Sequence, residues 1–312
     1  MAHRDEGSWL VNRFLVVCAL AMAGCATVAP GNGAVLGEKP SYIEAVTDGV
    51  PNQQAILRRI YTPGVDDAWI PQGLTIAEGD VLVAQYKPMP DLKANTGPCR
   101  VVRLDPATGK VRASFEMPVP ACTHAGGLAY LGKGQLLLAD TRTIYRIDME
   151  RAFASGKAEG AMKSLKLAGD LRGSFAAFDG EQPWIGTWTK DNAAKSLMYR
   201  LDTRLFDQFD GQSIDHAKAT ATMPVPLESQ GAAFDASGTP WVSASNGKWG
   251  KLYRLGRGGK VAAQYEMMAG LEDLNFDASG RLWGVSESGT RKYIHWPTKF
   301  PFVFQLDVAA LR

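Results

Sequence analysis

Short apolar runs recur along this sequence in three columns that keep the same order five times. The first column reads GLTI from residue 73, GLAY from 127, FAAF from 175, GAAF from 231 and DLNF from 273. The second reads LVAQY from residue 82, LLADT from 137, WIGTW from 184, WVSAS from 241 and WGVSE from 283. The third ends in VRLD at 102–105, YRID at 145–148, YRLD at 199–202, YRLG at 253–256 and FQLD at 304–307. Such runs, separated by Gly- and Asp-rich turns, predict β-strands in a repeat of about 50 residues.

A fourth strand is predicted after the third motif in four of the units, over residues 110–117, 161–167, 217–223 and 260–267. The fifth unit lacks one, but residues 55–61 precede the first unit and end in Thr-Pro-Gly, much as 110–117 end in Pro-Val-Pro. An N-terminal strand that completes the last unit is the usual closure of a β-propeller and removes an open sheet edge. We therefore expect an all-β, five-bladed propeller of four-stranded antiparallel blades, with a six-bladed ring as the alternative.

Composition narrows the class of partner. Apolar residues make up 46% of the chain and charged residues 21%, which is enough for a substantial core. Eight Trp and 33 Gly fit many short strands and tight turns better than helices. The net charge is only +2 and no Lys/Arg run occurs, so binding to nucleic acid through phosphate neutralisation is not expected.

The N-terminus has the pattern of a targeting segment. A polar start with His3, Arg4 and Arg13 precedes ten apolar residues, 14–23, too few to span a bilayer. The run ends in Met22-Ala23-Gly24-Cys25, which resembles the lipobox of bacterial lipoproteins, with Met22 at the leucine-like position. The resemblance implies that Cys25 is lipidated; an ordinary signal peptide cleaved nearby is the alternative.

These features predict the organisation and location of the chain. We expect a lipoprotein signal peptide over 1–24, a flexible tether rich in Gly, Pro and Ala over 25–53, and one propeller domain over 54–312. The mature protein is expected to be a monomer, anchored in the cell envelope by lipid. Ala26, rather than Asp, follows the cysteine. If the host has two membranes, this resembles the sorting signal of lipoproteins that are anchored in the outer membrane and face the periplasm.

The remaining cysteines favour an exported protein. Cys18 lies in the apolar run that would be removed, and Cys25 would carry the lipid. Cys99 and Cys122 are then an even pair in a compartment that permits disulfides, so we expect a bridge between them, with two free thiols as the alternative.

Candidate binding residues occupy one position of the repeat. In a propeller the first strands line the central channel, so residues just before them converge at one mouth. Glu287 in the second column extends the same region, and Trp188, Trp249 and Trp296 lie outside the recurring Trp column, so they are candidates for an exposed aromatic surface. The candidate ligand-binding residues are Gln72, His124, Arg172, Gln230, Glu272, Asp273 and Glu287.

Several roles are open to these side chains. Glu228, Glu272 and Asp273 are candidate ligands of Ca²⁺ or another divalent cation; the alternative is a structural network neutralised by Arg172. Alternation along a strand predicts that only one of the adjacent residues Glu272 and Asp273 faces the channel. His124, Glu228 and Glu272 are candidate catalytic residues, although a lone His124 is also typical of a hydrogen-bonded structural residue.

The motifs resemble those of uncharacterised secreted bacterial β-propellers. The resemblance rests on Pro71-Gln72-Gly73, His124-Ala125-Gly126-Gly127 and Glu272-Asp273-Leu274, followed by Leu282-Trp283 and Glu287. More distantly the chain is similar to gluconolactonase-type and streptogramin-lyase-type propellers and to five-bladed olfactomedin domains. In those groups a cation often lies near the channel, but no complete ligand set aligns with this sequence.

Two classes of function follow. The first is a cell-envelope lipoprotein whose propeller binds a small ligand or an envelope protein at the channel mouth. The second is a metal-dependent hydrolase or lyase, lactonase-like, acting at the same mouth. The sequence contains no G-x-S-x-G, H-E-x-x-H or phosphate-loop motif, which favours the first class.

Overall fold

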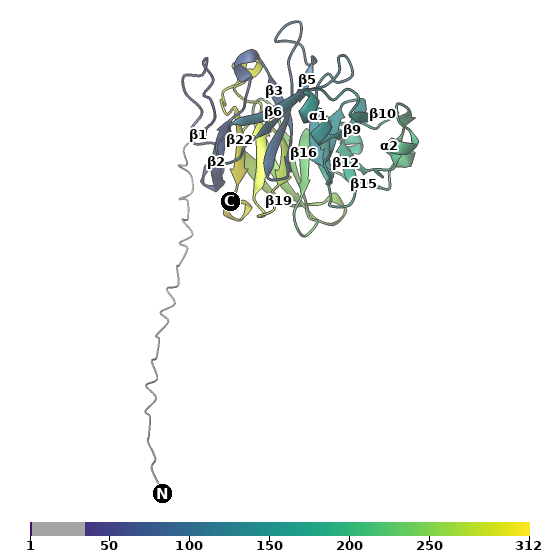
Figure 1. Ribbon diagram of the computed structural model, residues 1–312. Helices are drawn as coiled ribbons and strands as arrows, with labels where there is room; N and C mark the ends of the chain where they lie inside the picture. Colours follow the sequence, from purple (N-terminus) through teal and green to yellow (C-terminus); the bar gives the residue numbers. More distant parts are fainter. Residues whose placement is uncertain (2–34) are drawn as a thin grey trace.

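Five mainly antiparallel sheets make up the computed structural model, which describes Met1 and residues 35–312 (Figure 1). The innermost strands β3, β7, β11, β16 and β20 contact one another in that order, and β20 contacts β3, so the ring is closed. The prediction of five blades is confirmed, and the six-bladed alternative is wrong. The predicted signal peptide and lipidation at Cys25 lie outside the described residues.

The four predicted strands are present in blades 1 to 4. Blade 1 contains β3 (Ile70–Ala77), β4 (Asp80–Tyr86), β5 (Cys99–Leu104) and β6 (Val111–Glu116). Blade 2 contains β7 (Gly127–Tyr130), β8 (Gln135–Asp140), β9 (Thr143–Asp148) and β10 (Met162–Leu167), with β14 (Ser213–Ile214) on its outer edge. Blade 3 contains β11 (Phe175–Phe178), β12 (Pro183–Gly186), β13 (Leu197–Arg200) and β15 (Ala221–Pro224). Blade 4 contains β16 (Ser229–Phe234), β17 (Pro240–Ser245), β18 (Gly250–Leu255) and β19 (Val261–Met267).

Short helices connect some of these strands. The α-helices are α1 (Met149–Ser155) and α2 (Leu205–Gln208). The 3-10 helices are η1 (Gln53–Ala55), η2 (Val65–Asp67), η3 (Ala193–Lys195), η4 (His216–Lys218), η5 (Arg257–Gly259), η6 (Arg291–Tyr293) and η7 (Val308–Ala310). No helix in the described part of the chain is both long and apolar enough to cross a membrane.

Strands from the N-terminal and C-terminal parts of the described domain pair in blade 5. Its strands are β20 (Leu271–Phe276), β21 (Leu282–Ser286), β22 (Phe302–Leu306), β2 (Ile56–Tyr61) and β1 (Val35–Leu36). The pairing of β2 with β22 is antiparallel, so the predicted closure by an N-terminal strand is confirmed (Figure 1). Residues 35–53, the described part of the predicted tether, lie against the propeller, because β1 pairs with β2 and Ile43 and Val50 are buried.

The recurring Gly of the first column is explained by crowding at the channel. A Cβ atom added to Gly127 would lie 2.2 Å from the backbone N of Ala176, in the next inner strand. A Cβ atom on Gly231 would lie 2.4 Å from the Cα of Asp273. Five inner strands come so close together that backbone, rather than side chains, fills much of the centre.

The hairpin between the first and second strands is fixed by a hydrogen bond in three blades. An Asp in the turn accepts from the indole N–H of the second-column Trp, which is buried. The pairs are Trp184–Asp179 at 2.9 Å, Trp241–Asp235 at 3.1 Å and Trp283–Asp277 at 2.9 Å. The third-strand motif contributes to two of these turns, because Arg200 Nε lies 2.6 Å from Asp179 Oδ2 and Gln305 Nε2 lies 2.8 Å from Asp277 Oδ2.

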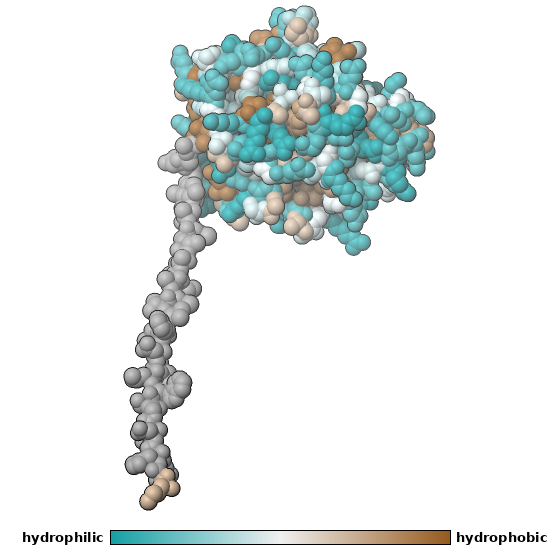
Figure 2. All heavy atoms as spheres, in the orientation of Figure 1, coloured by the Kyte–Doolittle hydropathy of each residue, from teal (hydrophilic) through white to brown (hydrophobic). Residues whose placement is uncertain are grey.

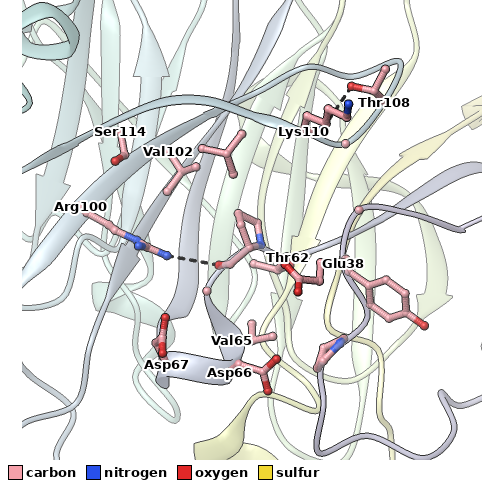
Figure 3. A pocket seen from close by; sticks show the side chains of 17 residues that line it. Glu38, Thr62, Val65, Asp66, Asp67, Arg100, Val102, Thr108, Lys110 and Ser114 are labelled. Atoms are coloured by element: carbon pink, nitrogen blue, oxygen red, sulfur yellow. Dashed lines mark hydrogen bonds between the residues drawn. The ribbon is translucent and has the colours of Figure 1, made fainter.

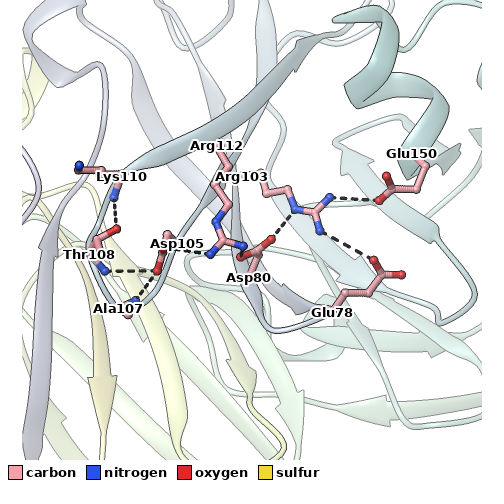
Figure 4. A network of polar contacts seen from close by, with 9 residues as sticks. All are labelled: Glu78, Asp80, Arg103, Asp105, Ala107, Thr108, Lys110, Arg112 and Glu150. Carbon is pink, nitrogen blue, oxygen red and sulfur yellow. Dashed lines mark hydrogen bonds and ion pairs between the residues drawn. The ribbon is translucent and has the colours of Figure 1, made fainter.

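Blade 1 replaces the Trp with an ion-pair network (Figure 4). The nearly buried carboxylate of Asp80 contacts Arg103 at 2.6 Å and Arg112 at 2.8 Å. Arg103 also contacts Glu150 of α1 at 3.1 Å, and Arg112 contacts Asp105 at 2.9 Å. The network therefore joins the outer strands of blade 1 to the neighbouring blade.

A disulfide joins Cys99 at the start of β5 to Cys122 in the loop before blade 2. The predicted bridge is thus confirmed. Disulfides persist in oxidising compartments, so the bridge is typical of an extracytoplasmic location. The molecular face in Figure 2 is mostly hydrophilic, with hydrophobic atoms in small separate groups, a distribution that is ordinary for a protein surface.

We expect Gly127→Ala to destabilise the fold. The added methyl group would overlap the backbone of β11, and overpacking of this kind costs about 1–3 kcal/mol. Gly256→Ala is the matched control, because the nearest atom to its added Cβ lies 3.6 Å away. Urea unfolding of both variants checks this, and equal stabilities would contradict the crowded channel.

Candidate functional site

A cavity of about 590 Å³ lies where the loops enter the inner strands. The predicted residues that line it are Gln72, His124, Arg172, Gln230 and Glu287, one from each blade or from the loop that leads into it. The structure thus brings together five of the seven predicted ligand-binding residues at one mouth of the channel. Their role in binding stays a prediction.

β-Bulges direct several of these side chains. The strand register shifts between Pro71 and Gly73, between Ser229 and Gly231, and between Leu271 and Leu274. The bulges leave Gln72, Gln230, Glu272 and Asp273 out of regular alternation, and a bulge re-aims the side chains that it carries. Glu272 accepts from Gln230 in β16, and Asp273 accepts from Leu74 in β3, so both carboxyl groups contact other inner strands.

Asp273 lies at the centre of the ring and is fully buried. Its Oδ2 accepts hydrogen bonds from the backbone N–H of Leu74 in β3 and of Leu128 in β7, both at 3.0 Å. Its Oδ1 accepts one from Leu274 at 2.9 Å. Burial raises the pKa of Asp273 and backbone donors, including Ala232 in β16, oppose that rise. With its oxygens occupied by backbone N–H groups, this carboxyl group holds strands together rather than facing the cavity.

Glu272 and Glu287 form a buried, hydrogen-bonded carboxyl pair beside the cavity. Gln230 Nε2 donates to Glu272 at 3.0 Å, and Gln72 Nε2 donates to Glu287 at 2.8 Å. Burial raises the pKa of Glu272 well above its usual range, and the neighbouring charge of Glu287 raises it further. Burial also raises the pKa of Glu287 to about 8. The pair therefore retains a proton at neutral pH.

His124 is held in one orientation on the opposite side of the cavity. Its Nδ1 lies 2.7 Å from the carbonyl oxygen of Asn95, and its ring packs on Tyr86 with centroids 4.6 Å apart. Burial lowers the pKa of His124, which favours the neutral ring. A carbonyl only accepts, so Nδ1 carries the proton and Nε2 is left as an acceptor. The carboxylate of Asp140 fixes the backbone by accepting from His124 N at 2.7 Å.

The three candidate metal ligands have separate environments. Glu228 lines a neighbouring cavity and accepts from Asn246 Nδ2 at 3.0 Å, while Glu272 pairs with Glu287 and Asp273 binds backbone N–H groups. Across residues 35–312, no three His, Cys, Asp or Glu side chains are grouped so as to hold a metal ion. Their role as metal ligands stays a prediction.

Sequence reasoning missed Thr187, which is only 7% exposed and lines the same cavity. Its hydroxyl oxygen has no hydrogen-bond partner among the described residues. A repeat position could have identified this region, because the last residue of the second motif lines the cavity in four blades: Thr141, Trp188, Ser245 and Glu287. Trp188 is 42% exposed, as its place outside the Trp column predicted. Trp296, in the segment between β21 and β22 of blade 5, also lines the cavity.

A larger cavity, of about 820 Å³, lies elsewhere, where the N-terminal segment meets blade 1 (Figure 3). Arg100 crosses it, packing 4.1 Å from the ring centroid of Trp69 and donating to the carbonyl oxygen of Pro63 at 3.4 Å. None of the predicted site residues lines this cavity. The mouth cavity is smaller, but it receives polar groups from every blade, so it is the candidate site.

No protein-family model and no curated protein matches this sequence. Among solved structures, a streptogramin B lyase is 13% identical, with 81% of this chain and 97% of that chain covered and a TM-score of 0.41. A putative gluconolactonase is 15% identical, with 86% and 84% covered and a TM-score of 0.41. The Dos1 propeller is 14% identical over 69% of this chain, which spans 53% of that chain, with a TM-score of 0.37. Such distant likeness between propellers carries no information on activity.

We expect the free energy of unfolding to fall as the pH rises from about 5 to about 8. Burial raises the pKa of Glu287 to about 8 from its ordinary 4.5, so the native state holds a proton that the unfolded chain has lost. The contribution of this proton to the free energy of unfolding is therefore present at low pH and is lost as the pH approaches 8. The free energy of unfolding falls by up to about 1.4 kcal/mol per pH unit.

Urea unfolding across this pH range tests the expectation with Glu287→Gln, whose amide does not titrate. The variant should have a flatter stability profile than the wild type. Glu159→Gln is the control, because Glu159 is exposed and should leave the profile unchanged. Parallel profiles for wild type and Glu287→Gln would contradict the retained proton.

Proposed function

We propose that this protein is a cell-envelope binding protein whose mouth cavity holds a small polar ligand. The observation that carries the proposal is the hydroxyl of Thr187, which is buried, unpartnered among the described residues and next to the cavity. An unpaired buried hydroxyl costs about 1–3 kcal/mol, and a bound ligand would remove that cost. Polar groups from all five blades converge on the same space, as they do in ligand sites.

The cavity favours a small molecule over an envelope protein as the partner. Its volume of about 590 Å³ is within the range typical of small-molecule sites. Trp188 offers a flat aromatic surface, while Gln72, Gln230 and Glu287 offer amide and carboxyl groups. A ring with hydroxyl groups at its edge and an apolar face would use both kinds of contact.

A second function is supported by the carboxyl pair. Glu287 lines the cavity, and its pKa of about 8 is suited to proton transfer near neutral pH. A hydrolase or lyase that uses Glu287 as a general acid or base would need no nucleophilic side chain. The two functions differ in one result: an enzyme would consume the ligand, and Glu287→Gln would stop turnover while leaving the ligand bound.

We also propose that Cys25 carries a lipid that anchors the protein in the cell envelope. The support is the sequence Met22-Ala23-Gly24-Cys25 after an apolar run, together with a disulfide typical of extracytoplasmic proteins. Such an anchor would hold the propeller at the membrane surface while leaving the mouth cavity in an aqueous compartment.

Removal of the Thr187 hydroxyl should weaken ligand binding. A thermal-shift screen of millimolar monosaccharides, uronic acids, amino acids and nucleosides identifies a ligand, and calorimetry then compares wild type with Thr187→Val. We expect about a tenfold loss of affinity, equivalent to about 1.4 kcal/mol. Thr220→Val is the control, because Thr220 lies outside the cavity. The proposal fails if Thr187→Val binds as tightly as wild type or if no member of the set binds.

Replacement of Cys25 by Ser should release the protein from membranes. The acceptor thiol would be lost, so the variant should move from the membrane to the soluble fraction when cells are fractionated. Cys18→Ser is the control, since Cys18 lies in the segment expected to be removed. A Cys25→Ser protein that still sediments with membranes would rule out the lipid anchor.

A further inference from the structure

A second cavity, of about 550 Å³, adjoins the mouth cavity. Asn246, Gly247 and Trp296 line both, so the two spaces share one wall. The second cavity is also lined by Lys190, Glu228, Lys248, His295 and Pro297. A ligand longer than one ring could therefore continue from the mouth cavity past Trp296 into the second cavity.

The shared wall is rigid. The ring of Trp296 packs on Tyr293 with centroids 4.2 Å apart. A Cβ atom on Gly247 would lie only 2.6 Å from Cε2 of Trp296, and one on Gly270 would lie 3.0 Å from its Cζ3. The indole therefore fits against bare backbone on two sides and presents a fixed aromatic surface to both cavities.

Positive charge is in excess around the two cavities. Arg172 lines the mouth cavity and Lys190 and Lys248 line the second, and none of the three has a carboxylate partner within 4.0 Å among the described residues. Of the acids that line the two cavities, Asp170 is paired with Lys195 and Glu287 shares a proton with Glu272. Glu228 is then the remaining carboxylate of the lining against these three cations. A concave site with an excess of cations attracts an anionic ligand.

We propose that the two cavities together form one elongated site for an acidic oligosaccharide. This inference rests on the proposed function and specifies its ligand class. One sugar ring would occupy the mouth cavity beside Trp188, and the chain would pass Trp296 so that the next unit lies in the second cavity. Carboxylates on the sugar would meet Arg172, Lys190 and Lys248, and hydroxyl groups would meet the side-chain amides and Thr187.

Calorimetry with galacturonic acid, its dimer and its tetramer tests the proposal, with neutral cellotetraose as a charge control. In wild type, the acidic tetramer should bind at least about tenfold more tightly than the monomer and more tightly than cellotetraose. The double variant Lys190→Met, Lys248→Met should reduce the tetramer-to-monomer affinity ratio towards one. Lys260→Met is the matched control, since Lys260 is exposed and lines neither cavity, and it should keep the wild-type ratio.

Three outcomes would overturn the elongated acidic site: equal affinity for monomer and tetramer, equal affinity for cellotetraose and the acidic tetramer, or no binding of any acidic saccharide. The proposed function fails separately. If a small ligand binds the mouth and Thr187→Val weakens it, the binding protein stands while the oligosaccharide inference falls. If Thr187→Val binds every probe as wild type does, the mouth cavity is not the site, and both proposals fail.

Discussion

The carboxyl group of Asp273 is the interaction on which the ring depends most. It accepts backbone hydrogen bonds from β3 and β7 while its own strand, β20, closes the circle with β3. A hydrogen bond of this kind contributes about 0.5–1.5 kcal/mol, and a buried N–H group left without its partner would cost about 1–3 kcal/mol. In a five-bladed ring the inner strands are so close that a Cβ atom on Gly127 or Gly231 would overlap neighbouring backbone. A single buried carboxyl group can therefore reach several blades at once.

This crowding also sets where a ligand can bind. The centre is occupied by backbone and by Asp273, so polar side chains that begin the inner strands are displaced towards the mouth. β-Bulges at Gln72, Gln230 and Glu272 redirect these side chains. Gln230 then contacts Glu272, and Gln72 contacts Glu287. The close approach of the five inner strands thus also brings together the polar groups that surround the mouth cavity.

The acidic residues of the chain have different structural roles, although they occur in similar sequence contexts. Asp179, Asp235 and Asp277 fix hairpins by accepting hydrogen bonds from indole N–H groups. Asp80 instead forms ion pairs with arginines. In spite of partial burial, hydrogen bonds keep the pKa values of Asp179, Asp235 and Asp277 below their usual range. Burial instead raises the pKa values of Glu272 and Glu287, which share a proton. Retention of a proton near neutral pH separates the acids of the candidate site from the acids that stabilise turns.

The sequence alone determined the fold, because strand alternation and turn chemistry are local and were repeated five times; even the closing strand over 55–61 was evident. It also identified one residue position per blade at the mouth, since the repeat fixes where each loop emerges. Tertiary structure alone decided that Glu272 and Asp273 both contact other inner strands, that Glu272 meets Glu287 and that Glu228 lies in the adjoining cavity. It also decided that Thr187 has no hydrogen-bond partner among the described residues. These facts depend on bulges and on contacts between residues tens to hundreds of positions apart, and no local pattern specifies such distances.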